Sequence, residues 1–389
     1  MDKKRNGALG FWAFIFCMIF VLHYAYFFDP QKAADGGFAL YRGEIAIDFF
    51  FVLTGFLFAK QVNAIPDDRA FGWREYGAFL KGKLRMFLPA FTICWVVTFA
   101  LLNKAVYTDV KTLFNNFMTS LLELLPFRSA GFYAAPVDKL TLVGYRVMDQ
   151  AWVISACFIA MALLYPLYRH NRKRFEYYIA PVGAVLLLCF LFFRTRVLTG
   201  DSMLILDAKN KNLYFSFIGT YKAFGEILAG VAGYAIVRHF NAKKISKAKS
   251  HLLSLIELGS YLAAIGYMYL MLRLKLPKNF DYLAAAAIFI GVTVSFSEKS
   301  SISKLCDNGV FRFFGRFSLY PFLTFIMFAK TLPYFLPDMG TKQLTLVYMG
   351  LTLVSALIVM ALEKPFVKLV KSMKKCFVKP QSLPEKETA

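Results

Sequence analysis

The sequence predicts an all-α polytopic membrane protein, a bundle of about ten transmembrane helices. The 389 residues are 58% hydrophobic and only 18% charged, whereas a soluble domain is about half apolar and about a quarter charged. Apolar runs of about 20 residues recur along the chain, which is the length that a helix needs to cross the hydrocarbon core. The runs are continuously apolar, so they indicate helices rather than the alternating strands of a membrane barrel.

The apolar runs also predict a topology. We expect ten spans, at residues 9–28, 43–60, 86–103, 150–168, 176–193, 213–237, 252–272, 281–297, 311–332 and 343–362. An even number places both termini on one side, and most of the 46 Lys and Arg residues fall in loops on that side. The positive-inside rule therefore makes both termini cytoplasmic. The net charge of +22 is explained by these membrane-flanking loops, which contact anionic lipid, and does not indicate nucleic-acid binding.

One membrane domain accounts for nearly the whole chain. We assign residues 1–366 to it and residues 367–389 to a basic cytoplasmic tail, which should begin as an interfacial turn of helix and then become disordered. The first apolar run is too long for a signal peptide and lacks a cleavage site, so we expect it to remain as an anchor. The loop at 104–149 contains apolar residues at helical spacing, which predicts a helix on the outer leaflet. The rest of this loop either caps a cavity or is a plain connector.

The six cysteines do not indicate a disulfide framework or a metal centre. The chain has no Cys-x-x-Cys pair, and four of the six cysteines lie in predicted spans. We therefore expect no metal site.

His23 is the only histidine inside a predicted span. A neutral imidazole can take a proton from a hydroxyl or attack an acyl carbonyl. With a rise of about 1.5 Å per residue, His23 lies past the middle of the membrane, toward the outside. The alternative is a structural histidine that is hydrogen-bonded to a neighbouring helix.

Asp48 lies inside a run of phenylalanines in the second span. A charge in such a segment costs about 2.5–3.5 kcal/mol on insertion scales, so it usually has a function. Asp48 should lie at a depth similar to that of His23 and could orient its imidazole, or it pairs with Arg42 or a buried cation. Lys222 and Glu226 are one helical turn apart in the sixth span, so they either neutralise each other or line a pathway.

Basic residues precede Pro89 on the predicted cytoplasmic face. Lys81, Lys83 and Arg85 could bind a phosphate-bearing ligand, or they only set the topology. In the fourth span, Trp152 is typical of an interface anchor, and Ser155 could form a hydrogen bond between helices.

Several motifs resemble those of the membrane acyltransferase 3 family, in the same order along the chain. The second span contains DFFFVLTGFL, from Asp48 to Leu57 with Thr54 inside it, which is similar to the family's GVDLFFVLSGFL. The other matching motifs are VLH ending at His23, the basic stretch before Pro89, WVIS at Trp152–Ser155, GRFSLY containing Arg316 and Ser318, and EKPF beginning at Glu363.

The resemblance implies an integral membrane enzyme, in a bacterial plasma membrane, that O-acylates surface glycans and similar acceptors. An acyl-coenzyme A, serving as co-substrate rather than bound cofactor, would enter from the cytoplasm and donate its acyl group, most simply acetyl. His23, oriented by Asp48, would act as base or transient acyl carrier toward an external sugar hydroxyl. The resemblance gives donor-phosphate binding to Lys81, Lys83, Arg85 and Arg316, and supporting roles to Thr54, Trp152, Ser155, Ser318 and Glu363.

The chain also departs from the family pattern, as a divergent member. Three ionisable side chains of the family pattern are missing. The chain has Trp12-Ala13 where the family has Arg or Lys, Ala156-Cys157 where it has Glu, and Thr324-Phe325 where it has His. Either Arg85 or Arg316 substitutes for the missing cation, or the activity is altered or lost. Two other functions therefore stay open: a transporter or flippase of a glycan or lipid-linked intermediate, and a catalytically degenerate partner subunit. The acyl group, the acceptor and the oligomeric state do not follow from the sequence.

Overall fold

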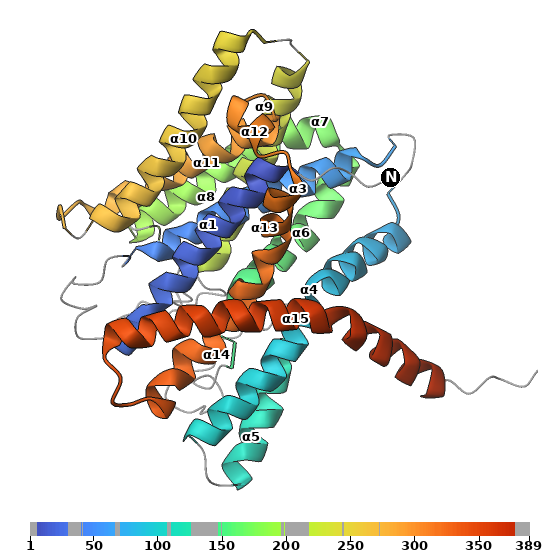
Figure 1. Ribbon diagram of the computed structural model, residues 1–389. Coiled ribbons are helices and arrows are strands. Elements are labelled where there is room, and N and C mark those ends of the chain that lie inside the picture. The colour runs from blue at the N-terminus through green and yellow to red at the C-terminus, as the bar shows by residue number, and fades with distance from the viewer. Residues whose placement is uncertain are drawn as a thin grey trace, which may run out of the picture.

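A computed structural model describes residues 6–29, 40, 42–66, 71–106, 110–125, 147–148, 150–195, 198, 218–242, 245–271 and 273–377. Within these ranges every regular element is a helix (Figure 1). The first half of the chain forms α1 (Gly7–His23), η1 (Tyr24–Phe28), η2 (Gly43–Ile45), α3 (Ala46–Asn63), α4 (Trp73–Val106), α5 (Val110–Leu121), η3 (Leu122–Leu124), α6 (Ala151–His170), α7 (Arg172–Arg174), η5 (Phe175–Ile179) and α8 (Ala180–Thr195). The second half forms α9 (Ile218–Asn241), α10 (Lys247–Leu270), η6 (Lys278–Phe280), α11 (Asp281–Ser297), α12 (Ser301–Leu305), α13 (Gly309–Phe317), α14 (Leu319–Phe335) and α15 (Thr341–Phe377).

The helices confirm a multi-pass membrane protein but not the number of ten spans. Each of the ten predicted segments contains a helix, and seven helices among the described residues are long and apolar enough to cross a membrane. Helix α11 is apolar but has only 17 residues. Helix α9, which carries Lys222 and Glu226, is not among the seven. The orientation of the termini stays a prediction.

The predicted ninth span, 311–332, is broken into two helices that meet at Ser318. Helix α13 packs against α1 so closely that a Cβ atom on Gly315 would lie 2.6 Å from the Gly10 Cα atom. Helix α14 packs mainly against α15 and α4 and keeps a smaller contact with α1, and the Tyr320 hydroxyl donates to Glu363 of α15 at 2.5 Å. Because the main partners of the two halves differ, the chain turns between them.

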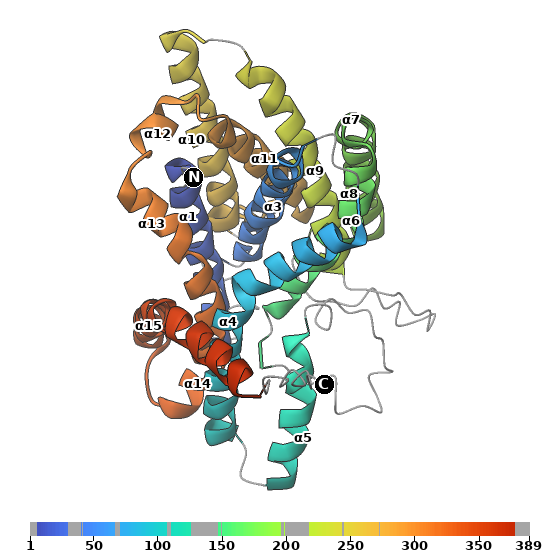
Figure 2. The same cartoon turned by 90° about the vertical axis from the view of Figure 1, so that its right-hand side faces the viewer.

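Helices α4 and α15 are the two long helices that leave the bundle. Both contain an internal proline, Pro89 in α4 and Pro365 in α15, and a proline inside a helix removes a hydrogen bond and bends it. Figure 2 shows α4 changing direction along its length, and Figure 1 shows α15 crossing the bundle and bending in its later part. Helix α15 runs through residue 366 to Phe377, so the start of the predicted tail continues the last helix.

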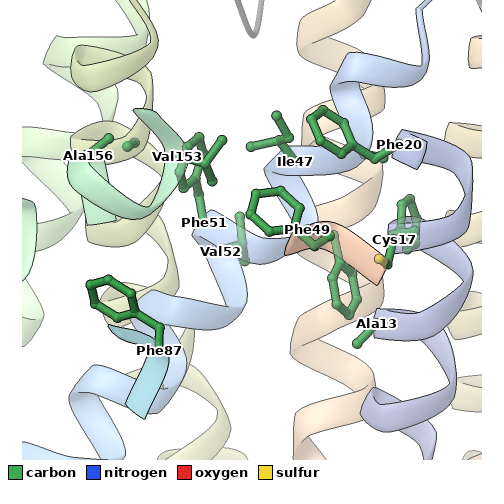
Figure 3. Packing of buried hydrophobic residues seen from close by; sticks show 14 of the residues in the cluster. Ala13, Cys17, Phe20, Ile47, Phe49, Phe51, Val52, Phe87, Val153 and Ala156 are labelled. Carbon is green, nitrogen blue, oxygen red and sulfur yellow. The ribbon is translucent and has the colours of Figure 1, made fainter. Parts of the chain in front are cut away.

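Helix α3 lies at the centre of the bundle, between α1, α6, α9 and α11. Its phenylalanines point in different directions: Phe49 lies toward α1, and Phe51 toward Val153 of α6 (Figure 3). The rings of Phe16 and Phe49 stack with their centroids 4.9 Å apart, an arrangement that stabilises beyond buried area alone. The run of phenylalanines in the sequence is therefore the core of the bundle.

Two glycines bring α3 and α9 into backbone contact. A Cβ atom on Gly55 would lie 2.8 Å from the Gly230 Cα atom, and one on Gly230 would meet the backbone of Val52 and Phe56. Small residues at a helix interface permit this approach in membranes, where close packing and hydrogen bonds drive association. This contact sets the position of every side chain that α3 and α9 share.

We predict that Gly230→Ala destabilises the protein by about 1–3 kcal/mol, because the new methyl group forces the two backbones apart. The measurement is the midpoint of thermal unfolding in detergent. Gly266→Ala in α10 is the matched control, since a Cβ atom there meets nothing within 4 Å. An unchanged midpoint in Gly230→Ala would contradict the close approach.

Candidate functional site

His23 is the last residue of α1, and it is 8% exposed. Its Nδ1 atom lies 2.9 Å from the backbone carbonyl oxygen of Leu40. A carbonyl oxygen only accepts hydrogen bonds, so this contact assigns the proton of the neutral ring to Nδ1 and makes Nε2 the basic nitrogen. The ring is also packed against Gly43, where a Cβ atom would lie 2.6 Å from the His23 Cβ atom. The imidazole is therefore held in one tautomer and one orientation.

Glu44, rather than Asp48, is the acid beside His23. The Nε2 atom of His23 lies 4.0 Å from Oε2 of Glu44, and Glu44 is 8% exposed. The sequence motifs do not mark Glu44. The signal was present, because Glu44 stands one helical turn before Asp48, at the start of the same apolar segment.

A buried ionic network continues from Glu44 into two other helices. Arg42 donates from Nη1 to Oε1 of Glu44 at 2.5 Å and pairs with Asp281, the first residue of α11. The Tyr267 hydroxyl of α10 donates to the same aspartate at 2.7 Å. Burial lowers the pKa of Arg42, but the charges of Glu44 and Asp281 outweigh burial and raise this pKa above its ordinary value.

Asp48 forms an ion pair with Lys222 of α9, and both side chains are fully buried. Of the roles considered for Asp48, the structure places it in the pairing role with a buried cation. The sequence left Lys222 and Glu226 either to neutralise each other or to line a pathway; in the structure the ion pair of Lys222 is with Asp48, which α3 brings to the lysine. Both carboxyl oxygens of Glu226 lack a hydrogen-bond partner among the described residues.

The close contact of α3 with α9 explains this pairing. Asp48 lies seven residues before Gly55, and Lys222 lies eight residues before Gly230. Two parallel helices that touch at the glycines therefore bring these two side chains together about two turns earlier.

Three of the four predicted donor-binding cations lie on α4, and Arg316 lies on α13. Lys81 and Arg85 are exposed. Lys83 is half-buried, and its Nζ atom lies 5.2 Å from the centre of the Phe79 ring. Arg316 is exposed in the last turn of its helix. Donor binding by these residues stays a prediction.

A groove of about 520 Å³ lies at the end of α3 far from Asp48, and Phe79, the ring beside Lys83, is among its lining residues. Gln61 and Ile65 line it from the α3 side, and Arg74, Phe79 and Tyr165 line it from α4 and α6. The groove and His23 are thus at opposite ends of α3.

The residues predicted as supporting hold helices together. The Cys157 thiol of α6 contacts the Thr54 hydroxyl of α3 at 4.0 Å. The carbonyl of Ser318 accepts from the Cys17 thiol of α1 at 3.0 Å, and Glu363 accepts from Tyr320. Ser155 is buried in α6.

Trp152 is not the interface anchor that its place at the start of a span indicated. It is 3% exposed, and a Cβ atom on Gly219 would lie within 3 Å of its ring. Its ring packs between α9 and Phe51 of α3.

At two positions where the chain departs from the family pattern, the side chain is buried and contacts a neighbouring helix. Trp12 is buried against Tyr261, with ring centroids 4.3 Å apart. The Thr324 hydroxyl donates to the carbonyls of Tyr320 and Thr352. Among the described residues, no three His, Cys, Asp or Glu side chains are grouped to hold a metal ion.

These features define a multi-pass helical membrane protein with a buried, oriented histidine at one end of its bundle. A family model described as an acyltransferase domain, Acyl_transf_3, matches residues 13–363. The chain therefore belongs to the acyltransferase 3 family. Searches of curated proteins and of solved structures found no match to the chain.

We predict that Lys222→Met destabilises the protein strongly, because it leaves Asp48 and Glu226 as two buried acids without their cation. Breaking a buried pair from one side costs about 3–5 kcal/mol. Glu226→Gln, which keeps the Asp48–Lys222 pair, should cost much less. Thermal unfolding of both variants in detergent tests this order, and equal losses would contradict the pairing.

Proposed function

We propose that this protein is an integral membrane O-acyltransferase that moves an acyl group, in the simplest case acetyl, from a cytoplasmic acyl-coenzyme A to a hydroxyl of an extracytoplasmic glycan or similar acceptor. Family membership supports the reaction type. The observation that carries the proposal is His23, whose ring is fixed through Nδ1 so that the basic Nε2 faces Glu44.

The chemistry requires one proton acceptor at the acceptor hydroxyl. Nε2 of His23 takes the hydroxyl proton while the oxygen attacks the thioester carbonyl. The C–S bond then breaks, and the thiolate of coenzyme A takes the proton from the imidazolium, giving an ester and a free thiol. In the alternative order, Nε2 attacks the thioester first and holds the acyl group before the hydroxyl receives it.

The donor would bind at the opposite end of the bundle from His23. Lys81, Lys83, Arg85 and Arg316 are proposed to attract its phosphates, and the groove lined by Phe79 lies beside Lys83. Lys83 is the cation best placed to guide the donor inward, because it is half-buried and its Nζ atom lies 5.2 Å from the centre of the Phe79 ring, which lines the groove.

The proposed setting is the bacterial plasma membrane. The predicted topology puts the groove on the cytoplasmic side and His23 toward the outside. Acyl-coenzyme A is a co-substrate in this scheme, not a bound cofactor, and the external acceptor would approach His23 from the loop side of α1 and α3.

The test is release of free coenzyme A from acetyl-coenzyme A in membranes that contain the protein and cell-wall glycan. We expect His23→Ala to reduce release by about 10²–10⁴-fold, the usual contribution of a general base. His170→Ala, at an exposed histidine of α6, is the matched control and should keep the wild-type rate.

Equal release by wild type and His23→Ala would remove His23 from the mechanism. If wild type releases no coenzyme A with acetyl, succinyl or longer donors, the proposal fails, and transport or a partner-subunit role becomes the better explanation.

A further inference from the structure

We infer that Glu44, held in place by Arg42 and Asp281, is the positioning residue for His23 and stabilises its imidazolium during acyl transfer. The inference deepens the proposed function and rests on it. It gives Glu44 the role that the sequence motif indicated for Asp48.

The geometry between the two side chains fits a charge interaction rather than a ground-state hydrogen bond. Nδ1 of His23 is engaged by the Leu40 carbonyl, so Nε2 is the nitrogen that receives a proton. Oε2 of Glu44 lies 4.0 Å from Nε2, which is too far for a hydrogen bond. At this distance a carboxylate still attracts a positive charge strongly in a buried site, so the attraction appears when Nε2 becomes protonated.

The carboxylate of Glu44 is fixed from its other side. Oε1 accepts from Arg42, and Arg42 is in turn paired with Asp281. Among the described side chains, one guanidinium thus faces two carboxylates. All three residues are at most 8% exposed, so solvent screens their charges little.

The backbone next to Glu44 packs closely against His23. Gly43 packs directly on His23, where any larger residue would collide with the His23 Cβ atom. Glu44 lies in the turn η2 at the start of α3, where the positive end of the helix dipole favours a carboxylate.

The other charged groups described around this site are also paired. Asp48 and Lys222 form an ion pair with each other, and Asp281 accepts from Tyr267 as well as from Arg42. Among the described residues, Glu44 is the carboxylate beside His23, and its pairing with Arg42 holds it there.

The experiment measures kcat and the KM for acetyl-coenzyme A in membranes containing Glu44→Gln, which removes the charge but keeps the shape. We expect kcat to fall by about 10- to 100-fold, the range that the loss of a close buried charge interaction produces. The KM should stay at the wild-type value, because the phosphates of the donor would bind at the other end of α3, away from Glu44. Glu44→Asp, which retains the charge, should recover part of kcat.

A double-mutant cycle tests whether Glu44 acts through the histidine. In the His23→Ala background, Glu44→Gln should cause no further loss, since residues that act as one unit are not additive. Glu257→Gln is the matched control: Glu257 is also a buried acid, but its partners are Ser295 and Ser300. It should keep the wild-type kcat per amount of folded protein, measured by size-exclusion chromatography.

Three results would overturn the inference while leaving the proposed function intact: a wild-type kcat in Glu44→Gln, an equal additional loss in the His23→Ala background, or a loss that appears only in KM. Absence of coenzyme A release by wild type, or full release by His23→Ala, would overturn the proposed function and this inference with it. These last two results are obtained without any Glu44 variant, so the two failures are distinguishable.

Discussion

The backbone contact between α3 and α9 is the constraint on which the rest of the bundle depends. Gly55 and Gly230 allow the two helices to touch, and the contact brings Asp48 to Lys222 in a region where either charge alone would be costly. This pair fixes the rotation of α3 about its own axis as well as its distance from α9. Its phenylalanines then point at α1 and α6, and Glu44, one turn before Asp48, is turned toward the end of α1.

The site around His23 follows from three chain segments that converge at one end of the bundle. The end of α1 supplies the histidine, the segment before α3 supplies Arg42 and Glu44, and the start of α11 supplies Asp281. Buried charges of both signs alternate there, so each group holds the next in place. The imidazole itself is oriented by the Leu40 carbonyl and by its packing on Gly43.

The sequence predicted the helices and the membrane class well, because length and apolar content are local properties. It identified His23 as the one buried histidine, which the structure places in an oriented pocket. It did not predict Glu44 beside His23, since that contact depends on how two helices end in space. It also left Lys222 and Glu226 to pair by their spacing within one helix or to line a pathway, while the tertiary contact with Asp48 prevails. The break at Ser318 was also missed: α13 is amphipathic and carries Arg312 and Arg316, whereas α14 is apolar, and the sequence does not show that they pack against different helices.

The later part of α15 has a consequence for the whole molecule. At 37 residues the helix is about 55 Å long at 1.5 Å per residue, well beyond the roughly 30 Å of hydrocarbon. Lys364, Lys368 and Lys371 recur at helical spacing on one side of this stretch, next to the bend at Pro365. A bent rod with one cationic side rests on anionic headgroups in a single rotational setting. Such a contact favours one tilt of the bundle relative to the membrane surface.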